Sequence, residues 1–81
     1  MIYINKEDCE LLYEEFKEYC QKNSQKIDAS EYPLFVLLNA ALLNTINNYD
    51  TMSQDDLKSM FISIYKVMEN EELENKYREV Q

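Results

Sequence analysis

The stretch YPLFVLLNAALLNTINNY, residues 32–49, decides the fold because it contains no charged residue. The 81-residue chain as a whole carries 16 Asp or Glu and 8 Lys or Arg. At about 100° per residue, one broad face of a helix here carries Leu34, Phe35, Leu38, Leu42, Ile46 and Tyr49. Val36 and Leu43 lie roughly opposite, so such a helix is apolar almost all round and needs cover on several sides. We therefore predict that this stretch forms the buried central helix of a soluble bundle.

The same stretch does not predict a membrane span. Its strongly apolar part covers only residues 34–43, and a span needs about 20 apolar residues. Asp28, Glu31 and Asp50 flank it, and no cluster of Lys or Arg is present to set an orientation across a bilayer. The short apolar start at residues 1–4 does not indicate a signal peptide. We expect no membrane contact and a cytoplasmic location.

Two further helices are predicted from their caps and apolar spacing. Asn5 is a typical N-cap with Asp8 three residues later, and the first helix then ends near residues 22–24. Its apolar positions repeat every three or four residues: Cys9, Leu12, Tyr13, Phe16, Tyr19 and Cys20. Ser53 begins a third helix in the same way, and its apolar positions are Leu57, Met60, Phe61, Ile64 and Met68.

The connections between these helices are short. Asp28 or Ser30 is the expected cap of the helix within residues 32–49, and Pro33 suits its first turn because the missing N–H is not needed there. Glycine is absent from the chain, so we expect asparagine to supply any turn with positive φ. Asn47 and Asn48 are the predicted left-handed cap at the end of this helix.

The C-terminal segment is charged but keeps an apolar spacing at Leu73, Tyr77 and Val80. Residues 70–81 therefore either form a short fourth helix capped by Asn70 or continue the third helix. We predict one all-α domain over residues 1–81, a small antiparallel bundle of three long helices plus a short C-terminal fourth helix.

The composition excludes most catalytic chemistry. Without histidine, the chain has no Ser-His-Asp or Cys-His nucleophile and no His-containing metal site. Without glycine, it has no phosphate-binding loop or dinucleotide fingerprint. Cys9 and Cys20 lie about 16 Å apart along one helix, too far for a disulfide, so we expect reduced, buried thiols. We predict no enzyme activity, no cofactor and no metal.

The charge balance predicts a basic protein partner. A net charge of −8 disfavours direct binding to nucleic acid, whose phosphates are bound mainly by Lys and Arg. On the first helix, one face carries four carboxylates with a tyrosine beside them, and these are the candidate partner-binding residues: Glu7, Glu10, Tyr13, Glu14 and Glu18. The alternative is that this face is only a solvated exterior that keeps the protein soluble.

The second candidate surface is the minor face of the helix within residues 32–49, at Val36, Ala40 and Leu43. Three interpretations remain open. The fourth helix can cover this face with Leu73, Tyr77 and Val80, a second copy of the chain can cover it in a homodimer, or a foreign partner can bind it.

These features favour a small, non-enzymatic, stoichiometric inhibitor that occludes a basic, nucleic-acid-binding site on a protein, acting as a nucleic-acid mimic. By analogy, phage-encoded antagonists of host defence, such as anti-CRISPR-like viral proteins, act in this way in the host cytoplasm. Two alternatives remain: an immunity or antitoxin-like protein that binds a toxin, and a homo-oligomeric structural module.

Overall fold

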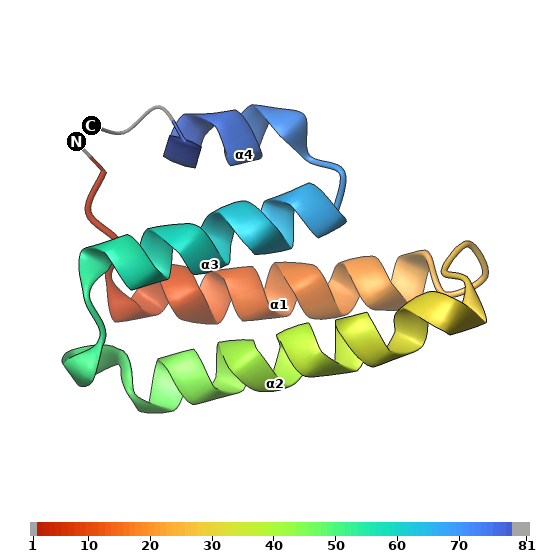
Figure 1. Ribbon diagram of the computed structural model, residues 1–81, viewed down its shortest axis with the longest axis horizontal. Coiled ribbons are helices and arrows are strands. Elements are labelled where there is room, and N and C mark those ends of the chain that lie inside the picture. The colour runs from red at the N-terminus through yellow and green to blue at the C-terminus, as the bar shows by residue number, and fades with distance from the viewer. Residues whose placement is uncertain (1, 79–81) are drawn as a thin grey trace.

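The computed structural model describes residues 2–78, and within this range every regular element is a helix and none is a strand (Figure 1). The elements in chain order are α1 (Lys6–Lys22), η1 (Ala29–Glu31), α2 (Tyr32–Asn47), η2 (Tyr49–Thr51), α3 (Gln54–Val67) and α4 (Glu71–Arg78). The all-α class is confirmed. The four α-helices contain 17, 16, 14 and 8 residues, and these lengths differ from the predicted three long helices and one short one.

The predicted start of α1 is confirmed by a reciprocal capping box. The Asn5 side-chain oxygen accepts a hydrogen bond from the Asp8 N–H at 2.9 Å, and the Asp8 carboxylate accepts one from the Asn5 N–H at 3.0 Å. Ser53 caps α3 by accepting from the Asp56 N–H at 3.1 Å. These caps satisfy backbone donors that have no partner inside the helix, which is why short polar residues mark both starts.

The start of α2 differs from the prediction. Neither Asp28 nor Ser30 caps this helix, because the short turn η1 intervenes and Glu31 occupies the N-cap position of α2 without a side-chain cap hydrogen bond. The Asp28 N–H instead donates to the Glu31 carboxylate at 3.4 Å, within η1. Pro33 lies in the first turn of α2, as predicted.

The left-handed residue of the chain is Glu69, not an asparagine. Among residues 2–78 it alone has a positive φ, at 58°, whereas Asn48 at the end of α2 has a φ of −116°. The Asn70 N–H donates to the Tyr65 carbonyl at 2.9 Å and the Glu69 N–H to the Lys66 carbonyl at 3.1 Å, the two bonds of a Schellman motif. Asn70 then caps α4 by accepting from the Leu73 N–H at 3.2 Å, so α3 ends and a separate fourth helix begins.

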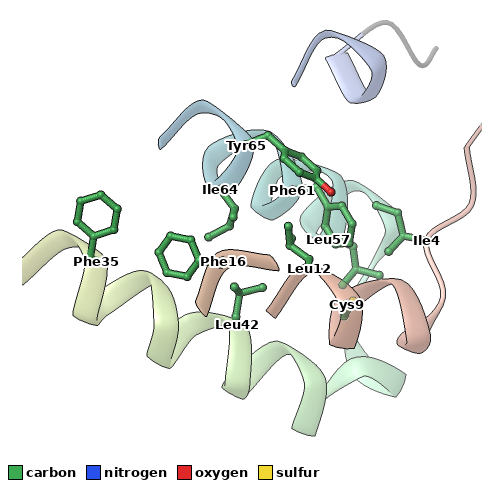
Figure 2. Packing of buried hydrophobic residues seen from close by; sticks show 10 residues of the cluster. All are labelled: Ile4, Cys9, Leu12, Phe16, Phe35, Leu42, Leu57, Phe61, Ile64 and Tyr65. Atoms are coloured by element: carbon green, nitrogen blue, oxygen red, sulfur yellow. The ribbon is translucent and has the colours of Figure 1, made fainter. Parts of the chain in front are cut away.

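The core lies between α1, α2 and α3 (Figure 2). Its buried apolar residues are Ile4, Cys9, Leu12, Phe16, Phe35, Leu42, Leu57, Phe61, Ile64 and Tyr65. The rings of Phe16 and Phe35 stack with centroids 5.8 Å apart and join α1 to α2. The Gln54 side chain accepts from the Ile4 N–H at 2.8 Å and donates to its carbonyl at 2.9 Å. These bonds fix the N-terminal segment to the start of α3.

Helix α4 packs against α3, on the side of the molecule away from α2 (Figure 1). The Tyr77 ring lies 5.0 Å from Phe61 and stacks on Tyr65 at 5.9 Å, measured between ring centroids. Of the three interpretations left open for the minor face of α2, the structure therefore excludes cover by Leu73 and Tyr77 of the fourth helix. Val80, the third residue of that prediction, lies outside the described residues.

Helix α2 is an outer helix rather than the buried centre of the fold. It buries one face, at Phe35, Leu42 and Thr45. The exposed fractions of Val36 and Leu37 are 69% and 64%, so the other side of this uncharged helix is left in solvent. The prediction that α2 is covered on several sides was wrong. The spacing of its residues shows that the helix is apolar all round, but it does not show whether the chain has enough helices to surround α2.

We predict that Glu69→Gly stabilises the protein. A left-handed conformation costs a non-glycine residue about 1–2 kcal/mol, and glycine avoids this cost. The greater freedom of glycine in the unfolded chain cancels about 0.4–1 kcal/mol of the resulting gain in stability. The free energy of unfolding, measured by urea denaturation, should rise by about 0.5–1 kcal/mol. In the control Glu72→Gly, inside α4, it should fall by about the same amount. An equal loss in both variants would contradict the left-handed assignment of Glu69.

We also predict that the fold loses stability at alkaline pH. Burial, with the Asp8 and Glu10 carboxylates nearby, raises the pKa of the Cys9 thiol from its usual 9.0 to about 11. Burial and the Glu15 carboxylate also raise the pKa of the Tyr65 hydroxyl. The folded state thus holds these protons more tightly than the unfolded state. The contribution of the two protonated groups to the free energy of unfolding is complete below pH 9 and is lost as the pH rises through their pKa values in the folded state.

The urea midpoint should therefore stay level up to about pH 8.5 and fall between pH 9 and 11. In Cys9→Ala the fall between pH 9 and 10 should be smaller, because only one thiol with a raised pKa, that of Cys20, remains. A wild-type midpoint that is the same at pH 8 and pH 10.5 would show that these groups are not buried.

Candidate protein-binding surfaces

The first candidate surface is the acidic surface of α1, formed by Glu7, Glu10, Glu14 and Glu18. All four side chains are exposed, and they follow one side of the helix over about 16 Å. Tyr13, the fifth residue predicted for this site, is half-buried and packs against the core. The Lys17 ammonium lies over its ring, 5.5 Å from the centroid.

Leu11 lies within the acidic surface and was not among the predicted site residues. Its exposed fraction is 62%. All four residues one helical turn away from it are acidic: Glu7, Asp8, Glu14 and Glu15. The sequence did carry a signal, because Leu11 is the apolar residue of α1 that falls outside the three- and four-residue spacing of the buried face.

Two lysines of α1 near the acidic surface, Lys17 and Lys22, contact side chains at its edges. Lys22 pairs with Glu18 at 2.7 Å, and this hydrogen bond and charge lower the pKa of the Glu18 carboxyl. Both side chains are well exposed, and such pairs contribute little to stability. Lys17 is placed over Tyr13. The carboxylates around Leu11 therefore keep a surplus of negative charge at the centre of the surface.

The second candidate is the apolar surface of α2, formed by Val36, Leu37, Ala40 and Leu43. All four residues are exposed, with fractions of 69% for Val36, 64% for Leu37 and 41% for Leu43. The structure thus brings the three predicted residues of the minor face together and adds Leu37. Asn44 and Asn47 are also exposed and continue this side toward the end of α2.

A shallow hollow of about 260 Å³ lies between α1 and α2, next to Val36 of the apolar surface. It is lined by Lys17 and Cys20 of α1 and by Phe35, Val36 and Asn39 of α2. Cys20 and Cys9 are both free thiols. Burial raises the pKa of Cys20, so at neutral pH its sulfur is protonated and a weak nucleophile. The hollow therefore offers packing surface rather than an activated group.

Within residues 2–78, no group of three or more Cys, Asp or Glu side chains is arranged to hold a metal ion. None of the helices described here combines the length and the apolar character required to cross a membrane.

Comparison with known proteins gives no relative from which a function can be transferred. No protein-family model, curated protein or solved structure matches the chain. We therefore infer a function from the two surfaces.

Proposed function

We propose that this protein is a non-enzymatic, stoichiometric inhibitor that binds a basic site on another protein through the acidic surface of α1. The observation that carries the proposal is Leu11, an exposed leucine with an acidic residue at each of its four neighbouring helical positions. In this proposal the four helices act together as one rigid antiparallel bundle that presents α1.

The arrangement around Leu11 matches the usual anatomy of a protein interface. Binding energy is concentrated in a few central side chains that become fully desolvated, and a polar rim around them excludes water. Leu11 can enter an apolar pocket of the partner, while Glu7, Glu14 and Glu15 meet Lys or Arg side chains around that pocket. The carboxylates mainly set partner choice and the association rate, and the leucine contributes contact area.

The same geometry favours occlusion of a nucleic-acid-binding site. Glu10, Glu14 and Glu18 are spaced one turn apart, about 6 Å along the helix axis, and form a row of negative charges. A groove that binds a phosphate backbone is lined by Lys and Arg, so it attracts such a row. A protein bound there blocks the groove without any chemical step, which fits a chain lacking histidine and glycine.

The proposal places the protein in the cytoplasm, or in the host cytoplasm if the gene is carried by a phage. An immunity or antitoxin-like protein would use the same acidic surface against a toxin and would differ in the identity of the partner. Identification of the bound protein separates these two functions.

We predict that a partner captured on immobilised protein binds through α1. Replacing Leu11 with Gln should weaken binding about 10- to 100-fold, since loss of a buried leucine contact costs about 1–3 kcal/mol. Glu7→Gln with Glu14→Gln should weaken binding mainly at low salt. The complex should dissociate near 0.5 M salt, where the screening length is about 4 Å. Surface plasmon resonance at several salt concentrations measures these effects.

The matched control is Glu71→Gln with Glu72→Gln, which changes the net charge equally but on α4, where both residues are exposed. This control should bind like wild type. Occlusion also requires that the captured partner lose its nucleic acid as the inhibitor is titrated to one equivalent. A ternary complex with nucleic acid, or equal weakening by the α1 and α4 pairs, would contradict the proposed function.

A further inference from the structure

We infer that the apolar surface of α2 is the contact between two copies of this chain, which form a symmetric homodimer with Ala40 near the centre of the interface. This inference does not depend on the proposed inhibitor function, because it concerns a different helix and can be tested without any partner.

The spacing of the exposed residues suits a second helix. Val36, Ala40, Leu43 and Asn47 follow one another at intervals of four, three and four residues, the alternation by which a helix presents one seam to a neighbouring helix. Ala40 is the smallest of them and allows two backbones to approach closely. Leu37 and Leu43 lie three residues on either side of it, so an antiparallel pair crossing at Ala40 places Leu37 of each copy against Leu43 of the other.

Charge favours a second copy over a basic partner at this surface. Helix α2, from Tyr32 to Asn47, contains no charged residue in a chain with a net charge of −8. Two copies that meet along α2 therefore place no carboxylates opposite one another, and their acidic surfaces on α1 stay in solvent. A cationic partner would gain no ion pair on α2.

The size of the surface predicts a dimer of moderate affinity. A helix of 16 residues is about 24 Å long and about 10 Å wide with its side chains. A strip of this length and width covers about 240 Å² on each copy, so contact along the whole of α2 covers about 500 Å² in total, below the total of about 1,000 Å² that is usual for a specific interface. We therefore expect association in the micromolar range, and the measurement must cover concentrations from about 1 to 200 µM.

No described element of the same chain covers this surface. Helix α4 is docked on α3 through Tyr77, on the opposite side of the molecule from α2 (Figure 1). The exposed fraction of 69% at Val36 shows that residues 2–78 leave this part of the surface uncovered.

The test is light scattering on the purified full-length chain over this concentration range, in 0.1 M and 0.5 M salt. At high concentration wild type should have twice the 9.7 kDa mass of one chain. The dimer should tighten with salt, because screening weakens the repulsion between two acidic copies and leaves the apolar contact intact. Val36→Glu and Leu43→Glu should each weaken dimerisation at least tenfold while the helical circular dichroism is retained.

The matched control is Leu34→Glu. Leu34 lies on the same helix with an exposed fraction of 45%, close to the 41% of Leu43, but it points about 180° away from Leu43 around the helix axis. Leu34→Glu should dimerise like wild type. Ala40→Cys adds an independent readout. Oxidation should rapidly link two copies of this variant by a disulfide at residue 40. Wild type, whose only cysteines are Cys9 and Cys20, should not form the linked dimer.

A wild-type monomer at 200 µM in 0.5 M salt would overturn the inference and leave this surface to a foreign partner. Equal effects of Leu34→Glu and Leu43→Glu would also overturn it, since they would indicate non-specific association. Glu7→Gln with Glu14→Gln should leave the dimer mass unchanged at 0.5 M salt, so failure of the homodimer and failure of the proposed function give different results.

Discussion

The packing of Tyr77 against Phe61 and Tyr65 determines which surfaces of this protein are free to bind. Aromatic pairs at these separations are stabilising beyond the area that they bury, and these rings attach the short helix α4 to α3. An isolated helix of 8 residues is unstable in water, so α4 depends on this contact. Because α4 is held on α3, the uncharged outer side of α2 stays uncovered.

Charged and apolar surfaces are separated on different helices. The exposed carboxylates of α1 surround Leu11, and α2 presents Val36 and Leu43 without a charged neighbour on the same helix. Salt should have opposite effects on binding at the two surfaces. It weakens the attraction of a basic partner to α1, and it reduces the repulsion between two acidic copies that meet at α2. The two proposals are therefore compatible: a dimer through α2 would present two acidic surfaces and could engage a partner with two sites.

Local features of the fold could be predicted from the sequence, and long-range ones could not. The caps at Asn5, Ser53 and Asn70 depend on residues within one helical turn, so the starts of α1, α3 and α4 were correct. The docking of α4 depends on contacts between Tyr77 and α3 that no periodicity encodes, so the sequence left the position of this helix open. The four α1 carboxylates were identified as exposed candidates, but Leu11 was missed because it lies outside the three- and four-residue spacing of the buried residues of α1.

The most direct test of this account is a nuclear Overhauser measurement on the Tyr77 ring in uniformly labelled protein. The ring protons should show contacts with Phe61 and Tyr65, and the methyl groups of Val36 and Leu43 should show none with residues 71–78 of α4. Contacts between Tyr77 and either of those methyl-bearing residues would place α4 on α2. That result would remove the free apolar surface on which the homodimer depends.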